Sequence, residues 1–455
     1  MPRRTQFLAT VLGLLVVAVT PAQGAPNDAL QDEQWAFSPQ TVFDLPAAWQ
    51  LSQGAGVVVA VVDSGMRMDH PDLAPNAWTN FGEIPGNGVD DDHNGYVDDV
   101  HGVDLTTTEA DNNNLHDGFG HGTHVSGTIA AAANSRGVVG VAFRARLMTV
   151  KVLDDQGAGM TGAVAEGIRY AAANGARIIN LSLESATDDP RMRDAIQAAA
   201  DANALVVASA GNSGYNVDQT PVFPVSIASS NLVGVAATEP DEGRTLPDFS
   251  NYGRLTIPVA APGVDVLSTS KDGGYETKSG TSMAAPHVAG VAALMAAVAP
   301  NLPAADLRAL LLQNAARGTV PVSNGYVDAL GSVLAASKGS SYQLAQPAQA
   351  RVLSATRTGK GKKAVTRAQI ALTGASQNVA KLVVKLDGRN AATLRGGRST
   401  LSVRMRGRTG RTLAVTALAA DGRTLATASA KVKALKPGKR NVRSGGGVGG
   451  SVWAG

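Results

Sequence analysis

The stretch that decides the fold is Val57-Val58-Val59-Ala60-Val61-Val62, which is followed at once by Asp63-Ser64-Gly65. The run is apolar throughout and rich in β-branched valine, so it predicts a β-strand. Because the apolar residues are continuous rather than alternating, both faces of this strand are expected to be covered. Asp63 then stands at the carboxyl end of a buried strand, where the ligand sites of parallel sheets lie.

Similar apolar runs recur along the first half of the chain and alternate with alanine-rich helical stretches. Further strands are expected at 147–152, 176–181, 204–210 and 232–237. A helix is expected at 161–174, and a second at 191–203, with Asp189 as its N-cap and Pro190 in its first turn. Strand and helix alternation of this kind predicts an α/β fold with a doubly wound, mostly parallel sheet.

Composition and charge exclude several classes of protein. The chain has 455 residues, 44% of them hydrophobic and none of them cysteine, which excludes a disordered chain and a disulfide-stapled small protein. The net charge of +3 conceals an asymmetry, because residues 351–455 hold 22 of the 40 Lys and Arg but only Asp387 and Asp421 of the acidic residues. An acidic body is therefore followed by a strongly basic region.

The first 24 residues have the features of a secretory signal peptide. Arg3 and Arg4 precede a largely apolar run over 7–19, and small residues follow at Ala22 and Gly24. A membrane anchor is the alternative, but the run is shorter than the ~20 residues that span a bilayer. The mature protein is expected to be secreted, either extracellular or held in the periplasm or at the cell surface, without a transmembrane anchor.

The pattern changes after residue 338. Residues 339–350 form a polar linker, and residues 351–435 show short alternating strands separated by turn signals such as Asp387-Gly388. This region predicts a small antiparallel β-domain, basic in charge. Residues 436–455, which are basic and then glycine-rich, are expected to be disordered. The division is thus a body over 25–338, a linker, a β-domain and a tail.

Three short motifs lie where a doubly wound sheet exposes its ligand site. They are Asp63-Ser64-Gly65, then Gly120-His121-Gly122-Thr123-His124, and then Gly280-Thr281-Ser282-Met283-Ala284. Taken together, in this order, they resemble the subtilases, the subtilisin-like serine proteases. The resemblance covers about residues 35–337 and includes three more motifs: His70-Pro71-Asp72-Leu73, Ser209-Ala210-Gly211-Asn212 and Ala261-Pro262-Gly263.

The resemblance implies a role for each residue of the site. Ser282 is the expected nucleophile, His121 the base that takes its proton, and Asp63 the group that orients the imidazole. Asn212 occupies the family's oxyanion position, where its amide donates together with the backbone N–H of Ser282. His124 and His287 are expected to be structural.

The resemblance also implies that the substrate backbone pairs with Ser182, Leu183 and Glu184. Relatives usually continue with two glycines where this chain has Glu184 and Ser185. Glu184, with Asp188 and Asp189 nearby, could narrow or acidify the entrance to the S1 pocket and so favour a basic P1 residue. The alternative is that Glu184 points into solvent.

Two calcium sites are expected. The loop from Asp90 follows the Asp-x-Asp-x-Asn-Gly pattern of an EF-hand-type site, with candidate ligands Asp90, Asp92, Asn94, the Tyr96 carbonyl and Asp98. The twelfth position is His101 rather than glutamate, which departs from a full EF-hand. The family resemblance implies a second site at Asp72 and Asn134, with backbone oxygens of residues 136 and 138. Calcium is expected to be structural.

The expected function is therefore that of a secreted, monomeric serine endopeptidase that hydrolyses polypeptides through an acyl-enzyme. A catalytically silent subtilase fold that binds through its basic tail is the alternative. The basic region could also contact an anionic surface or dock on the acidic body. Specific nucleic-acid binding is not expected, because residues 351–452 contain no aromatic side chain to stack on bases.

Overall fold

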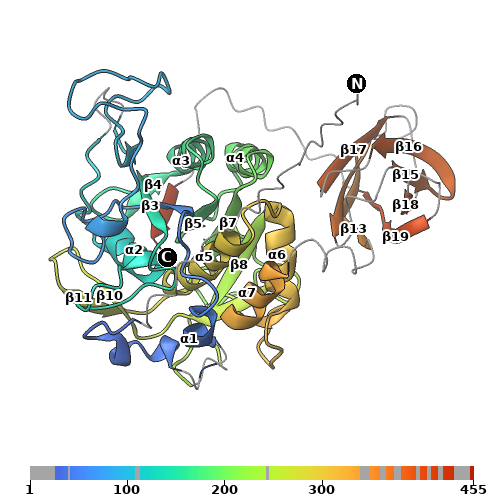
Figure 1. Ribbon diagram of the computed structural model, residues 1–455. Coiled ribbons are helices and arrows are strands. Elements are labelled where there is room, and N and C mark those ends of the chain that lie inside the picture. The colour runs from blue at the N-terminus through green and yellow to red at the C-terminus, as the bar shows by residue number, and fades with distance from the viewer. Residues whose placement is uncertain are drawn as a thin grey trace, which may run out of the picture.

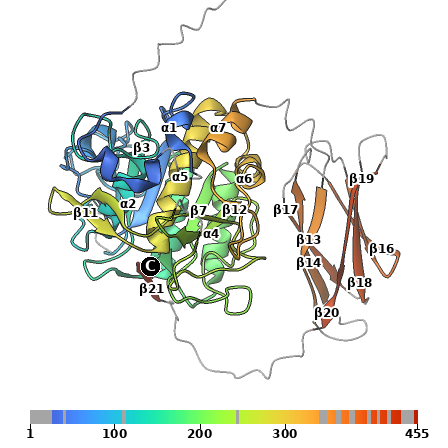
Figure 2. The same cartoon turned by 90° about the horizontal axis from the view of Figure 1, so that it is seen from below.

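The computed structural model describes residues 26–38, 41, 43–107, 113–241, 245–338, 349–358, 365–373, 381–395, 400–406, 411–418, 424–434 and 451–454. The expected signal peptide, most of the expected linker and residues 436–450 of the expected tail lie outside this part of the chain. Figures 1 and 2 show a larger body of helices around a sheet and a smaller body of strands.

The larger body is built on an eight-stranded parallel sheet, which confirms the predicted fold class. Its strand order is β12-β9-β8-β7-β5-β1-β3-β2. The strands are β1 (Val58–Asp63), β2 (Gly102–Asp104), β3 (Arg146–Lys151), β5 (Ile178–Leu181), β7 (Leu205–Ser209), β8 (Leu232–Thr238), β9 (Val259–Pro262) and β12 (Gly325–Tyr326). The chain moves from β1 to β3 on one side and then crosses to β5 on the other, so strand order reverses at β1. A crevice at such a switch point is the usual ligand site.

Helices cover both faces of this sheet, which explains the continuous apolar strands. On β1, Val59 and Val61 pack on one side while Ala60 and Val62 pack on the other. The first side carries α1 (Leu45–Ala48), α2 (His121–Ala130), α5 (Thr281–Val298), α6 (Ala304–Gln313) and α7 (Ala329–Ser337). The second side carries α3 (Thr161–Ala173) and α4 (Pro190–Asp201).

Local signals place α4 within two residues of the predicted range. The N-cap of α4 is Asp189, whose carboxylate accepts from the Arg191 N–H at 2.9 Å, with Pro190 in the first turn. Helix α5 begins at Thr281 and is long and apolar enough to cross a membrane, but 89% of it is buried in the protein. It is therefore the central core helix of this body, and its apolar character comes from packing on both sides.

The smaller body is a β-sandwich. One sheet has the order β17-β14-β13-β20 and the other β16-β15-β18-β19. Their strands are β13 (Gln349–Thr358), β14 (Val365–Thr373), β15 (Lys381–Leu386), β16 (Arg389–Arg395), β17 (Thr400–Arg406), β18 (Thr412–Leu418), β19 (Thr424–Lys431) and β20 (Lys433–Ala434). All pairs are antiparallel except β13 with β20. Strand β13 begins at Gln349, two residues inside the expected linker.

The end of the chain departs from the expected disorder. Ser451–Ala454 form a strand, β21, which pairs with β4 (Ala158–Met160) and with β6 (Leu183–Glu184). Figure 2 shows β21 lying against the larger body. The other small elements of that body are η1 (Gln31–Glu33), η2 (Trp35–Phe37), η3 (Ala74–Asn76), β10 (Val266–Thr269) and β11 (Tyr275–Lys278). The glycine-rich composition of the tail gave no sign of this pairing, because the pairing partner is far away in the sequence.

Candidate active site

The base and its orienting carboxylate meet where β1 ends and α2 begins. The His121 Nδ1–H donates to Asp63 Oδ1 at 2.8 Å and to Oδ2 at 3.0 Å. Asp63 is fully buried and His121 is 6% exposed, so little water screens the pair. Asp63 Oδ1 also accepts the Ser64 backbone N–H at 2.7 Å, which fixes the plane of the carboxylate.

A buried aspartate that sequence reasoning missed holds this end of α2. Asp117 accepts from the backbone N–H of Gly120 and of Thr123 and from the hydroxyls of Ser64 and Thr123, at 2.7–2.8 Å. Ser64 in turn accepts the Gly122 N–H at 2.9 Å. The carboxylate therefore ties the first turn of α2 to the end of β1, and so fixes His121 relative to Asp63. An aspartate shortly before a helix was the available signal.

The nucleophile candidate lies in the first turn of α5. Ser282 is fully buried, and its Oγ donates to the Ser182 carbonyl at 3.1 Å, while Ser182 Oγ donates to the Ser282 carbonyl at 2.8 Å. His121 Nε2 is buried without a hydrogen-bond partner in the described part of the chain. The second link of the expected triad, from Ser282 Oγ to His121 Nε2, is therefore not made in this conformation.

Asn212 is held so that its amide donor is left for a ligand. Its Oδ1 accepts both the Thr281 backbone N–H at 2.9 Å and the Thr281 hydroxyl at 3.0 Å. Because a backbone N–H is only a donor, this contact determines which end of the amide is oxygen. The turn before it needs glycine, since Gly211 has φ +99°, a backbone conformation that side chains disfavour.

The Glu184 side chain points toward the turn at Gly211 and Asn212. It does not point into solvent, which was the alternative expected from the sequence. Its carboxylate lies against Gly211, close enough that a Cβ there would meet Glu184 Oε2 at 2.1 Å. It accepts the Asn212 backbone N–H, while burial raises its pKa above the usual value for glutamate. A carboxyl group therefore lies directly beside the oxyanion residue.

The neighbouring acids Asp188 and Asp189 do not join Glu184. Asp189 caps α4, where the Arg191 side chain lowers its pKa and Thr161 donates to it at 2.6 Å. Asp188 pairs with Arg193. Neither carboxylate is left to acidify a substrate pocket.

His124 and His287, which were expected to be structural, are buried in the core. His124 Nε2 lies 3.0 Å from the Val266 carbonyl, and burial lowers its pKa to about 3. His287 lies 2.8 Å through Nδ1 from the Met283 carbonyl, and burial lowers its pKa to about 4. Both are neutral at physiological pH and hydrogen-bonded to the backbone, so they position helices.

The acidic loop forms a carboxylate cluster that includes two of the expected ligands, Asp90 and Asp92, and adds Glu83. Glu83, Asp90 and Asp92 each offer a carboxylate oxygen, and these oxygens lie within 4.8 Å of one another. Glu83 is 6% exposed, and its Oε2 is buried without a partner among the described residues. Asn94 remains in the loop, where its Nδ2 donates to Asp92 at 3.1 Å. An unpartnered buried carboxylate oxygen facing two others fits a hard cation.

Asp98 is not part of this cluster. Its carboxylate accepts the backbone N–H groups of residues 86, 87 and 88 at 2.7–3.3 Å, so it holds a neighbouring turn. Glu83 was missed because it lies seven residues before the loop motif. The only available signal was its acidic side chain close to Asp90 in sequence.

The second expected site also gains a residue. Asp72 is fully buried, and its carboxylate accepts the Asn134 amide N–H at 3.0 Å, so the two expected ligands lie side by side. Asp28 joins them, since its Oδ1 accepts the Asn134 N–H at 2.9 Å while its Oδ2 is buried without a partner in the described chain. Burial and the charge of Asp72 raise the pKa of Asp28. Two neighbouring buried carboxylates with a free oxygen fit a divalent cation that offsets their repulsion.

Comparisons with known proteins identify the family of this chain. A family model described as the subtilase family matches residues 54–369. Thermitase of Thermoactinomyces vulgaris is 37% identical over 272 residues, which are 60% of this chain and 85% of thermitase. An intracellular serine protease of Paenibacillus polymyxa is 38% identical over 284 residues, 61% of this chain and 78% of that protein. A solved protease structure from Pseudoalteromonas arctica PAMC 21717 aligns with a TM-score of 0.58 at 31% identity, over 69% of this chain and all of that one.

Proposed function

Because the chain belongs to the subtilase family and is a serine-type endopeptidase, we propose that it hydrolyses peptide bonds through Ser282, His121 and Asp63. The observation that carries this proposal is the buried Asp63–His121 hydrogen bond of 2.8 Å, with the other imidazole nitrogen left unpartnered. A buried nitrogen base without a partner is expensive unless it serves a ligand or a reacting group.

In the proposed reaction, Ser282 Oγ attacks the substrate carbonyl carbon while its proton passes to His121 Nε2. A substrate N–H that pairs with the Ser182 carbonyl competes with Ser282 Oγ for that acceptor and releases the hydroxyl toward the imidazole. The oxyanion that forms is held by Asn212 Nδ2 and by the Ser282 N–H, which lies in the first turn of α5 where helices leave N–H groups unpaired. His121 then protonates the leaving amine, and water hydrolyses the acyl-enzyme by the reverse route.

The test of this function is covalent labelling of the full-length protein with a fluorophosphonate reagent beside a Ser282→Ala variant. The expected result is stoichiometric labelling of the wild type and none of the variant, with the modified peptide identified by mass spectrometry. Ser282→Ala removes one buried hydroxyl and should leave the circular dichroism spectrum unchanged. Folded wild-type protein that fails to label would contradict the proposal and favour the silent binding module.

We propose that calcium binds at the Glu83, Asp90 and Asp92 cluster and at the Asp28 and Asp72 pair. Bound calcium would neutralise the carboxylate charges at both sites and so stabilise the folded chain. A site filled at about one hundred times its Kd contributes ~2.7 kcal/mol. For a body of this size that corresponds to a Tm increase of about 4 °C for each site.

The expected result is that EDTA lowers the Tm of the wild type and that Asp28→Asn and Glu83→Gln each lose part of the calcium-dependent shift. In EDTA, Asp28→Asn should be as stable as the wild type or more so, because it removes the repulsion between Asp28 and Asp72. Asp32→Asn, an exposed carboxylate four residues on, is the matched control. A full calcium shift in the double variant Asp28→Asn, Glu83→Gln would contradict both sites.

We propose that Glu184 selects a basic P1 residue, because its carboxylate lies beside the oxyanion turn. Peptides with Arg or Lys at P1 are then cleaved faster than those with Leu or Phe. A charged hydrogen bond worth about 1.5–3 kcal/mol gives a preference of about 10- to 100-fold in kcat/KM. Because burial raises the pKa of Glu184, the preference should grow as pH rises through that pKa.

Glu184→Gln should abolish the preference and its pH dependence, whereas Asp188→Asn should keep both because Asp188 is engaged with Arg193. The measurement is kcat/KM for matched peptides over a range of pH. Equal rates for basic and apolar P1 residues in the wild type would sink the idea.

Secretion is also a proposal, supported by the composition of residues 1–24. Cleavage there sets the start of the mature peptidase body after residue 24, and the basic β-sandwich follows that body. We propose that the sandwich contacts an anionic surface. Sequencing of the amino terminus of the exported protein tests the cleavage position.

A further inference from the structure

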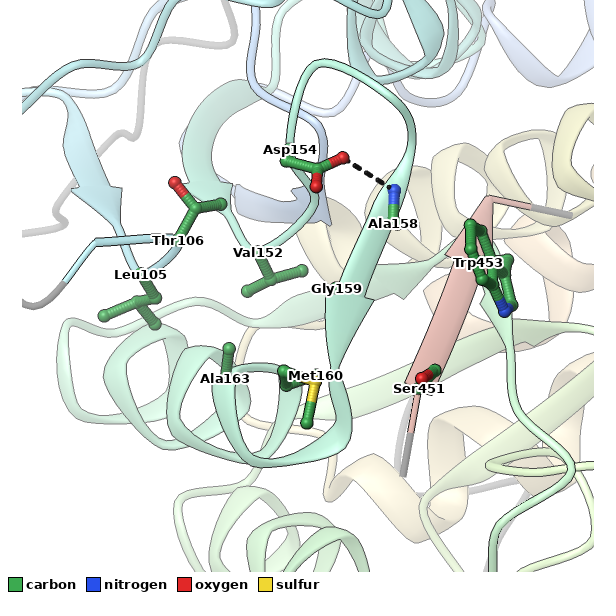
Figure 3. Close-up of a pocket in the computed structure, with 10 residues that line it drawn as sticks. All are labelled: Leu105, Thr106, Val152, Asp154, Ala158, Gly159, Met160, Ala163, Ser451 and Trp453. Atoms are coloured by element: carbon green, nitrogen blue, oxygen red, sulfur yellow. Dashed lines mark hydrogen bonds between the residues drawn. The ribbon is translucent and has the colours of Figure 1, made fainter. Parts of the chain in front are cut away.

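Strand β21, Ser451–Ala454, pairs with Leu183 and Glu184, which are expected to receive the substrate backbone. Strand β21 pairs antiparallel with β4 on one side, where Val452 is opposite Gly159, and with β6 on the other, where Trp453 is opposite Glu184. The Ala454 N–H also donates to the Gly157 carbonyl at 3.1 Å. Figure 3 shows the strand alongside Ala158–Met160, with Ser451 and Trp453 on the wall of the adjoining pocket.

Side chains of β21 alternate between the core and solvent, as those of a docked strand do. Val452 is fully buried and belongs to the same apolar cluster as Leu183 and Met192, whereas Trp453 is 55% exposed. The Ser185 hydroxyl donates to the Ser451 carbonyl at 2.6 Å. The segment is therefore held by strand pairing, by one buried side chain and by a side-chain hydrogen bond.

The register of β21 leads toward the nucleophile. Trp453 pairs with Glu184, and the next residue of β21, Ala454, pairs with Leu183. The residue that precedes β6 is Ser182, whose carbonyl accepts from Ser282 Oγ. Each backbone N–H and C=O of β4 and β6 that pairs with β21 is closed to an extended substrate, so the two cannot occupy the groove together.

The occupant belongs to the same chain as the body that it blocks. Residues 435–450 connect β21 to β20 of the smaller body, and residues 339–348 connect that body to the larger one. Connection within one chain gives a docked segment an effective concentration on the order of 1 mM. If the docked segment has an intrinsic Kd between about 0.1 and 1 mM, this effective concentration keeps it bound for half of the time or more. Substrate must then displace it, so KM is about two- to tenfold higher than it is without the segment.

We propose that Ser451–Ala454 is an intramolecular competitive inhibitor that occupies the substrate groove between β4 and β6. The inference rests on the proposed function, because it assumes that Leu183 and Glu184 receive the substrate backbone. It differs from that function in naming a regulator of the site and its source, the chain itself. A polypeptide substrate is admitted when this segment is displaced, and the catalytic residues need not change.

The decisive variant is Val452→Asp, which places a charge in a fully buried position and should release β21. Val448→Asp makes the same change four residues earlier and outside the paired strand, so it is the matched control. Deletion of residues 451–455 is the second variant, and it stands in if Val452→Asp fails to fold. For an extended peptide substrate, KM should fall about two- to tenfold in the release variants with kcat unchanged, and should not move in Val448→Asp.

A binding measurement separates this inference from the proposed function. In a Ser282→Ala background, a fluorescein-labelled peptide Gly-Gly-Ser-Val-Trp-Ala-Gly, the sequence of residues 449–455, is titrated by fluorescence anisotropy. It should bind about two- to tenfold more tightly to the Val452→Asp and deletion variants than to Val448→Asp. This readout needs no catalysis, whereas fluorophosphonate labelling reports on Ser282 alone.

Equal peptide affinity in the release and control variants would overturn the inference, whether or not Ser282 labels. The ratio of wild-type to released KM should also be independent of enzyme concentration, because the inhibitor is part of the same chain. A ratio that rises with concentration would overturn the intramolecular assignment in favour of exchange between copies.

Discussion

Replacing His121 by alanine is expected to lower kcat on the order of 10⁶-fold, a magnitude known from a subtilisin. The reason is that Ser282 then has no base within reach. His121 Nε2 is the nitrogen left unpartnered in the buried site, and its Nδ1 is already engaged with Asp63. KM should change little, because the imidazole contributes to the transition state and not to ground-state binding.

The control for this variant is His116→Ala, an exposed histidine that precedes α2 by a few residues. It should keep full activity. Steady-state kinetics of the purified proteins, with circular dichroism to verify folding, provide the measurement. A loss of less than about 100-fold in His121→Ala would show that another group takes the serine proton. Adding Ser282→Ala to His121→Ala should cost almost nothing further, because the two residues act as a unit.

The second large effect is expected for Asp63→Asn, which should lower kcat about 10⁴-fold while leaving the fold intact. Asp63 Oδ1 accepts the Ser64 N–H, and a substituted amide keeps that contact with its oxygen. The amide nitrogen then lies where Oδ2 is now, 3.0 Å from His121 Nδ1. It donates to Nδ1, so the proton moves to Nε2 and the nitrogen that should act as base carries a hydrogen.

This prediction is tested by kcat measurements and thermal unfolding together. The Tm of Asp63→Asn should stay within a few degrees of the wild type, since shape and hydrogen-bond count are kept. Asp69→Asn, an exposed carboxylate paired with Arg67, is the matched control and should behave as the wild type. A loss of activity that follows the loss of folded protein would contradict a role in setting the imidazole tautomer.

The relation between Asp117 and this site shows where sequence reasoning stops. The motifs around Asp63, His121 and Ser282 are short and contiguous, so each could be read without a structure. Asp117 joins β1 to α2 by accepting from four groups spread over residues 64–123. A carboxylate of that kind has no local pattern, because its partners come together only when the sheet and helix are packed.

The residues proposed to bind calcium differ in the same way in how they could be found. Asp90, Asp92 and Asp72 were found from a loop pattern and from a family resemblance. Glu83 and Asp28 were missed, although each carries the unpartnered buried oxygen that argues most directly for a cation. Burial is a tertiary quantity, and a carboxylate in a sequence does not reveal whether water will reach it.

The fold class, the strand ends and the likeness to subtilases follow from local sequence alone, because continuous apolar runs, caps and motif order are properties of neighbouring residues. Three features follow only from the packed molecule: the Glu184 carboxylate beside Gly211, the Asp28–Asp72 pair, and β21 between β4 and β6. Each joins segments that lie far apart in the chain or depends on which atoms are shielded from water. A four-residue strand such as Ser451–Ala454 has too little intrinsic propensity to form by itself. Its conformation is imposed by the groove that it fills, and that groove exists only after the sheet and its helices have assembled.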